Sequence, residues 1–147
     1  MREIEFRAWL KEEKKIVGVE EIDFIGQKSI AYDEIEYRYT DKEPFHYTRW
    51  VDFEDIELMQ SSGLRDKTRT KEYPEGKKIF EGDIVKCKVY SLDNEHWEID
   101  SIGQVMYDDD CCAYFIKFDE SCIHLTSAWD LKVIGNIYEN KELLENV

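Results

Sequence analysis

Hydrophobic and polar residues alternate along most of this chain, with the period of two that is typical of half-buried β-strands. The apolar positions of the clearest stretches are Ile4, Phe6 and Ala8; Ile35, Tyr37 and Tyr39; Val85, Cys87 and Val89; and Cys112, Tyr114, Ile116 and Phe118. Polar segments such as Asp108–Asp110 separate these stretches, and Asp is a favoured turn residue. The pattern therefore predicts a mainly β fold built from antiparallel hairpins.

Helical patterns are confined to two short segments. Asn140 can cap a helix over residues 141–146, in which Leu143 and Leu144 can pack on the body of the protein. A single helical turn is also predicted within residues 52–59. We therefore expect an α+β protein in which strands dominate.

Charge divides the chain into three parts. Residues 1–64 have a net charge of −7, residues 65–78 have +3 and residues 79–147 have −10, which gives −14 for the 147-residue chain. The middle segment has no Val, Ile or Leu, so it cannot build a core of its own. We predict a β-rich N-terminal part (1–64), a basic linker or loop (65–78) and a C-terminal β part with a short terminal helix (79–147).

The composition argues against several kinds of chemistry. A net charge of −14 repels phosphate backbones and anionic lipid surfaces, so direct binding to nucleic acid or membrane is disfavoured. Cys111 and Cys112 are adjacent, and adjacent strand residues point to opposite faces, so a zinc site with Cys122 and His124 is disfavoured. We expect these cysteines to fill gaps in the core as reduced thiols. No nucleophile motif is present, and we expect no catalytic residue, cofactor or metal.

Aromatic and basic residues are the candidates for an interaction surface, because Tyr, Trp and Arg dominate protein interface hot spots. The candidates are Tyr37, Tyr39, Tyr47, Trp50 and Trp97, together with Arg65, Lys67, Arg69 and Lys71 of the basic segment. The alternative for each aromatic residue is ordinary packing across neighbouring strands. Both interpretations stay open at this level.

Five separated blocks carry a family resemblance. They are Arg2–Trp9, Phe53–Gln60, Gly63–Lys67 (Gly-Leu-Arg-Asp-Lys), Lys78–Lys86 with its Glu-Gly-Asp turn, and Val133–Asn140 with its Ile-Gly-Asn-Ile-Tyr-Glu-Asn ending. In this order they resemble the YopX family of phage and prophage proteins. The segment 68–77 is longer and more basic than the turn usual in the family, and we expect an enlarged hairpin over residues 91–100.

The resemblance implies a C-terminal part similar to an SH3-like small barrel, preceded by a smaller α+β part, and it transfers no catalytic or binding residue. The alternation after Gly82 agrees with a barrel of five strands, because a glycine can turn the chain there. The expected strands are residues 84–90, 103–107, 112–118, 123–125 and 131–138.

The leading hypothesis is a non-enzymatic protein-interaction module that forms a homo-oligomer and binds an unidentified host or phage protein in the bacterial cytoplasm. The first residues mix acids and bases where a signal peptide needs an apolar stretch. The basic segment of one subunit could dock on the acidic surface of the next, which salt would weaken. The alternative is an acidic nucleic-acid mimic that occupies a host DNA-binding protein.

Overall fold

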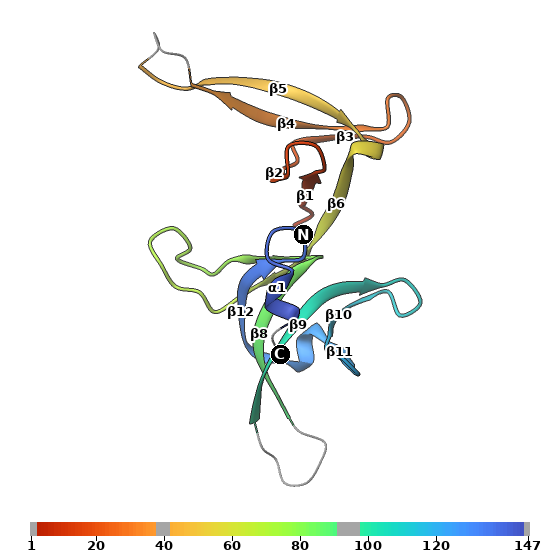
Figure 1. The fold of residues 1–147 in the computed structure, drawn as a ribbon, viewed down its shortest axis with the longest axis vertical. Coiled ribbons are helices and arrows are strands. Elements are labelled where there is room, and N and C mark those ends of the chain that lie inside the picture. Colours follow the sequence, from red (N-terminus) through yellow and green to blue (C-terminus); the bar gives the residue numbers. More distant parts are fainter. Residues whose placement is uncertain (1–2, 38–41, 91–97, 146–147) are drawn as a thin grey trace. The chain divides into compact units, whose positions relative to one another are not determined.

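The computed structural model describes residues 3–37, 42–90 and 98–145. The chain forms two compact units: an N-terminal unit, Glu5–Gln60, and a C-terminal unit, Ser61–Val147 together with Met1–Ile4. Antiparallel strands make up most of both units (Figure 1). The predicted mainly β fold is therefore confirmed.

The N-terminal unit is built from two groups of strands. They are β1 (Phe6–Leu10), β2 (Lys15–Gly18), β3 (Glu21–Asp23), β4 (Ser29–Glu36), β5 (Phe45–Asp52) and the first half of β6 (Ile56–Arg65). Strand β1 pairs with β2 and β6, whereas β3, β4 and β5 form a separate sheet in that order. Its buried core consists of Ala8, Leu10, Ile30, Tyr32 and Ile56. Among its described residues, the expected helical component is limited to the 3-10 turn η1 (Phe53–Asp55).

The C-terminal unit contains a curled five-stranded sheet (Figure 1). The elements of the C-terminal unit after the basic segment are β7 (Lys78–Phe80), β8 (Asp83–Tyr90), β9 (Glu98–Asp108), β10 (Ala113–Lys117), β11 (Cys122–His124), the 3-10 turn η2 (Leu125–Ser127) and β12 (Trp129–Asn136). Strand β7 pairs with β6 and is not part of the five-stranded sheet. All five strands expected after Gly82 are present. The sheet order is β11-β10-β9-β8-β12, which makes β11 and β12 the outer strands. Its core consists of Ile79, Val85, Cys87, Val105, Ile116 and Leu125.

The chain ends in a short helix, α1 (Glu142–Glu145), as predicted, but the predicted cap is wrong. The side-chain oxygen of Asn140 accepts a hydrogen bond from the backbone N–H of Asn136 at 3.2 Å. The Asn136 side chain in turn accepts from the N–H groups of Tyr138 and Glu139, both at 3.0 Å. The two asparagines therefore build the turn that leaves β12. No helix among the described residues is long and apolar enough to cross a membrane.

The cysteines correct one sequence-based expectation. Cys111, Cys112 and Cys122 are exposed, so they do not fill the core, whereas Cys87 is buried. Cys112 lies in the β9–β10 turn with a φ of 50°, not on a strand. The predicted turn is present there, because Asp108 Oδ1 accepts hydrogen bonds from the two backbone N–H groups of residues 110 and 111.

A buried carboxylate closes the turn before β8. Asp83 is 1% exposed, and its Oδ2 accepts a hydrogen bond from the Phe80 backbone N–H at 2.8 Å. Gly82 has a φ of 80°, a conformation that favours glycine. The Glu-Gly-Asp block of the sequence thus serves as a turn that starts the five-stranded sheet.

A second buried carboxylate fixes the basic segment to the same sheet. Asp66 is 2% exposed and accepts backbone hydrogen bonds from Thr68 at 2.9 Å, from Lys77 at 2.8 Å and from Val133 of β12 at 2.8 Å. The Thr68 hydroxyl donates a fourth hydrogen bond at 2.9 Å. Residues 66–77, which we name the basic loop, therefore leave β6, return as β7 and belong to the C-terminal unit.

The basic loop closes tightly around this carboxylate. Gly76 has a φ of 93°, and a Cβ atom there would lie 2.2 Å from the Asp66 carbonyl oxygen, so only glycine fits. Burial by itself raises the pKa of the Asp66 carboxyl. The N–H groups of Val133, Lys77 and Thr68 and the Thr68 hydroxyl outweigh that effect, and the pKa lies below its ordinary value.

Replacing Asp66 by Asn should lower the free energy of unfolding by about 2–4 kcal/mol, because an amide leaves buried N–H donors without an acceptor. Urea unfolding at neutral pH measures the change. Asp110→Asn is the matched control, since it makes the same chemical change at an exposed turn residue and should alter stability by less than about 0.5 kcal/mol. Equal effects of the two variants would contradict the structural role of Asp66.

The stabilisation by Asp66 should also depend on pH. A carboxyl whose folded-state pKa is depressed stabilises the fold above its unfolded-state pKa of about 3.9, and this contribution disappears as the pH falls through the lower folded-state pKa. The difference in unfolding free energy between wild type and Asp66→Asn should therefore be full at neutral pH and shrink below about pH 4. A difference that stays constant down to pH 3 argues against an ionised Asp66.

Thiol labelling should separate Cys87 from the other three cysteines. Burial, and secondarily the charge of Asp100, raises the pKa of the Cys87 thiol to about 11. Iodoacetamide at mildly alkaline pH should modify three thiols of the folded protein and the fourth only in denaturant, as counted by mass spectrometry. A Cys87→Ser variant that folds should give three adducts in both conditions; four adducts on the folded wild type would contradict this assignment.

Candidate functional site

Strands β4 and β5 form a long hairpin, which we name the β4–β5 ribbon (residues 29–36 and 45–52). Pairing is continuous, from Ser29 opposite Asp52 to Glu36 opposite Phe45. Strand β3 pairs only with residues 29–31 of β4. The sheet is therefore two-stranded beyond Ala31 (Figure 1).

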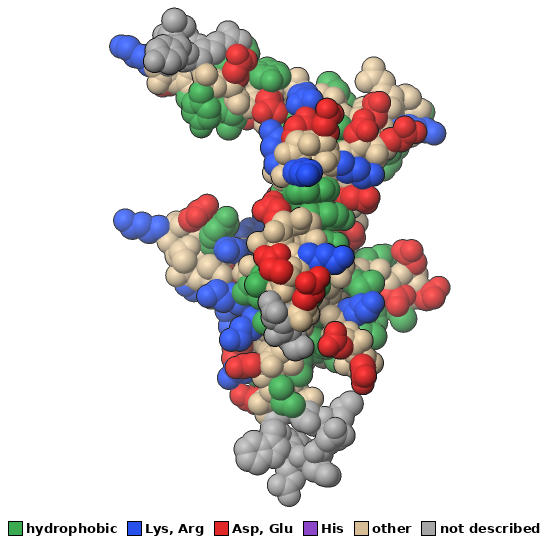
Figure 2. Space-filling model, in the orientation of Figure 1, with side chains coloured by type: hydrophobic (Ala, Val, Ile, Leu, Met, Phe, Trp, Pro, Cys, Tyr) green, Lys and Arg blue, Asp and Glu red, His purple; other side chains and the backbone are tan. Residues whose placement is uncertain are grey.

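Large apolar side chains are exposed on both faces of this ribbon. They are Ile35 (44% exposed), Phe45 (43%), Tyr47 (39%) and Trp50 (45%), with Tyr37 (83%) directly after β4. Phe45 and Tyr47 stack with their ring centroids 6.0 Å apart. A two-stranded ribbon is marginally stable in water without further packing. Hydrophobic side chains along it are visible in Figure 2.

A polar cluster holds the base of the ribbon. The Tyr32 hydroxyl donates to Glu34 at 2.7 Å, Lys15 of β2 donates to Glu34 at 3.0 Å, and Arg49 pairs with Glu13 at 2.8 Å. Burial, followed by the hydrogen bond to Glu34, raises the pKa of Tyr32 to about 12. The Tyr32 hydroxyl and then Lys15 hold the pKa of Glu34 below its ordinary value. These contacts orient the ribbon against β2 and leave its far half exposed.

The basic loop and Arg65, the last residue of β6, carry the second group of predicted residues. Arg65 donates to the Gly76 carbonyl oxygen at 3.1 Å, and Arg69 donates to two loop carbonyl oxygens. Lys67 forms an ion pair with Asp130 of β12. Because these contacts hold the three cationic side chains, their positive charges have fixed positions at the loop.

Further lysines from the sheet extend the basic surface of the C-terminal unit. Lys86 of β8 lies directly opposite Lys132 of β12, and both are exposed, as is Lys71 at the loop. In this unit the Lys and Arg side chains gather around the loop, whereas Asp and Glu side chains gather at the β9–β10 turn (Figure 2). The lysine pair was missed from the sequence because it depends on which strands pair.

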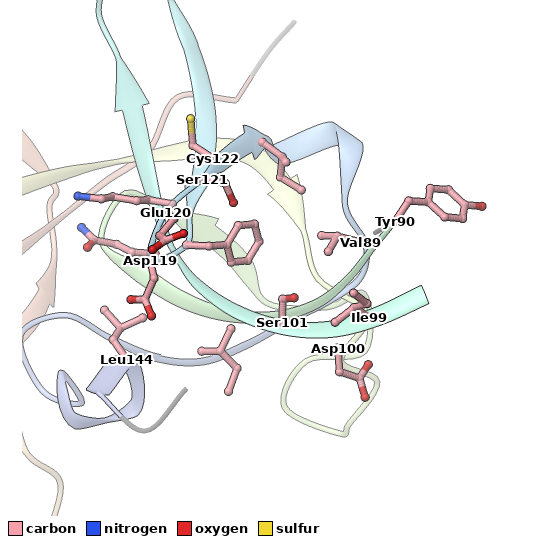
Figure 3. A pocket seen from close by; sticks show the side chains of 15 residues that line it. Val89, Tyr90, Ile99, Asp100, Ser101, Asp119, Glu120, Ser121, Cys122 and Leu144 are labelled. Atoms are coloured by element: carbon pink, nitrogen blue, oxygen red, sulfur yellow. The ribbon is translucent and has the colours of Figure 1, made fainter. Parts of the chain in front are cut away.

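A hollow of about 970 Å³ lies along β8, β9 and the β10–β11 turn, and its volume is at the upper end of those of small-molecule pockets. Val89, Ile99 and Phe118 supply apolar lining, and Asp119 and Glu120 supply acidic groups (Figure 3). No convergent set of catalytic groups lines it among the described residues. Among the described residues, no three His, Cys, Asp or Glu side chains are grouped so that they could hold a metal ion.

The predicted interaction residues therefore divide between the units. Tyr37, Tyr47 and Trp50 belong to the N-terminal unit, whereas the basic residues belong to the C-terminal unit. Tyr39 and Trp97 lie outside the described residues. The sequence analysis missed Asp66, whose hydrogen bonds fix the position of the basic loop.

Comparison with known proteins agrees with this architecture. A crystal structure of protein EF1440 from Enterococcus faecalis is similar, with a TM-score of 0.58 and 26% sequence identity over 98% of this chain and 99% of that chain. No curated protein matches the chain. The family model described as YopX protein matches residues 5–145. Together with the five sequence blocks, this match over nearly the whole length shows that the chain belongs to the YopX family.

Proposed function

We propose that this protein is a phage- or prophage-encoded interaction module of the bacterial cytoplasm, which acts by binding another protein and not by catalysis. The observation that carries the proposal is the β4–β5 ribbon, whose apolar side chains are exposed on both faces. Ordering such a ribbon in water is unfavourable unless a partner covers it. We propose that the C-terminal unit supports this binding without making the main contact. We also propose that its curled sheet is an SH3-like barrel.

The use of the family motifs supports the same proposal. Three of the five blocks each contain a polar residue whose side chain accepts hydrogen bonds that stabilise a turn or loop. These residues are Asp66, Asp83 and Asn136. The presence of these three residues in the family motifs is therefore explained by their role in the fold. The ribbon is the surface that folding does not explain.

Affinity capture from host lysate tests the proposal. A Tyr47→Thr/Trp50→Thr double variant removes two exposed aromatic side chains but keeps the β-propensity of β5. We expect wild-type protein to retain a specific host or phage protein, and the double variant to retain it at least fivefold less.

Tyr107→Thr is the matched control, because Tyr107 is 40% exposed against 39% for Tyr47 and also contacts one aromatic ring, that of Tyr114. It should leave capture unchanged. Capture that is insensitive to the ribbon variant, or no capture at all, contradicts the proposal. Circular dichroism confirms that each variant is folded.

A nucleic-acid mimic is the second candidate, and one observation favours it. Five acidic residues from the two ends of β10, Asp108, Asp109, Asp110, Asp119 and Glu120, line one hollow of about 710 Å³. Clustered carboxylates can imitate a run of phosphates. In the same capture experiment, mimicry requires that the retained proteins bind DNA, that salt releases them and that the ribbon variant retains them as well as wild type does.

A further inference from the structure

Strand β5 is an outer strand of its sheet over its entire length. The sheet order is β3-β4-β5, so among the described residues β5 has a neighbouring strand on one side only. Each outer strand offers a row of backbone N–H and C=O groups that can pair with another chain. Strand β5 is eight residues long, which is long for an outer strand.

This edge lacks several of the devices that normally prevent strand pairing, although it carries the charged residues Arg49 and Asp52. Its sequence, Phe-His-Tyr-Thr-Arg-Trp-Val-Asp, contains no Lys and no Pro, and its pairing with β4 shows no bulge. It is rich in aromatic and β-branched residues, which favour strands. Arg49 and Asp52 balance each other, so β5 carries no net charge within a chain of −14.

We propose that β5 pairs antiparallel with β5 of a second copy of this chain, so that two ribbons join into one continuous sheet. This inference goes beyond the proposed function, because it gives the ribbon a second partner, which is another copy of this chain. A two-fold axis perpendicular to the sheet relates the copies and presents the same edge from each. Pairing converts two marginal two-stranded ribbons into a four-stranded sheet.

Symmetry and charge select the register. Because the two-fold axis is perpendicular to the sheet, the same face of β5 lies on the same side of the joined sheet in both copies. Side chains alternate between the two faces along a strand. Residues that lie opposite each other must therefore be both odd-numbered or both even-numbered. Two registers align the most residues: one places Thr48 opposite Thr48, and the other places Arg49 opposite Arg49. Like charges directly opposite each other are destabilising. The structure therefore favours the register centred on Thr48.

The pairs that this register creates are favourable. Arg49 lies opposite Tyr47, Trp50 opposite His46, and Val51 opposite Phe45. Aromatic and β-branched residues stabilise a sheet when they lie opposite each other on neighbouring strands, and a cation beside an aromatic ring adds to this. One strand pair makes a small interface, so we expect a weak dimer.

Salt distinguishes this pairing from docking of the basic loop on an acidic surface. Two copies of a chain with a net charge of −14 repel each other, and salt screens that repulsion. Dimers formed through β5 should therefore become more stable as salt is added, whereas loop docking should weaken.

Sedimentation equilibrium of the full chain at several concentrations, in low and high salt, tests the proposal. We expect a monomer–dimer equilibrium that shifts toward dimer in high salt. Thr48→Lys places two ammonium groups together on the symmetry axis and should raise the dissociation constant at least tenfold. Thr126→Lys is the matched control, because it makes the same change at an exposed residue of the other unit, and it should leave the constant unchanged.

Cross-linking gives a second readout that does not depend on the Lys variant. In a background with Cys111, Cys112 and Cys122 replaced by Ser, Thr48→Cys should form a disulfide-linked dimer under mild oxidation, because the Cα atoms of directly opposite residues lie ~5 Å apart, within the range of a disulfide. Asp33→Cys is the control, since Asp33 pairs with Thr48 from the inner strand. Its two copies would lie three strand spacings apart, ~14 Å, which is too far for a disulfide.

The outcomes separate the two proposals. A monomer under all conditions, or a dimer that Thr48→Lys leaves intact and Thr48→Cys does not link, overturns pairing through β5. If the monomer still captures a protein through Tyr47 and Trp50, the interaction function stands and only the self-pairing fails. A dimer that salt dissociates also overturns this inference and favours docking through the basic loop.

Discussion

The four hydrogen bonds that the Asp66 carboxylate accepts are the contact on which the C-terminal unit most depends. They join the start of the basic loop, its end and β12 through one buried anion. Burial of an unpaired carboxylate would be costly, but here three backbone N–H groups and the Thr68 hydroxyl donate to it, so ionisation is favoured. The loop can therefore be rich in like charges without separating from the sheet.

In the N-terminal unit, by contrast, the β4–β5 ribbon extends beyond the buried core. The core of this unit reaches Tyr32, and beyond that residue the described part of the ribbon continues with pairing on one side and exposed aromatic side chains. The Tyr32, Glu34 and Lys15 cluster closes the core at that point with polar contacts. Beyond it, folding of the monomer supplies backbone hydrogen bonds but little burial, and burial is the dominant favourable term in folding and in association. The ribbon is consequently the place where a second chain can contribute most.

Local patterns predicted the strands well because alternation is a property of neighbouring residues: Val85 and Cys87 are buried, as their spacing indicates. Features that depend on distant residues could not be found in this way. The partners of Asp66 are 11 and 67 residues away, at Lys77 and Val133. The Asn140 cap failed because Asn136 competes for its side chain. Exposed aromatic residues could be proposed from composition, but their position on an outer strand required the sheet order.

Charge sets the limits on how copies of this chain can associate. At a distance the net −14 dominates, and it repels a second copy as well as any other anion. At contact, however, only groups within about a Debye length count, roughly 8–10 Å at physiological ionic strength. Strand β5 is neutral over its own length, because Arg49 offsets Asp52, and the other acids of the ribbon are on β4, one strand spacing further from the partner. Backbone pairing and apolar burial at this edge can therefore outweigh a repulsion that salt removes, whereas attraction between a basic loop and an acidic surface would be lost under the same conditions.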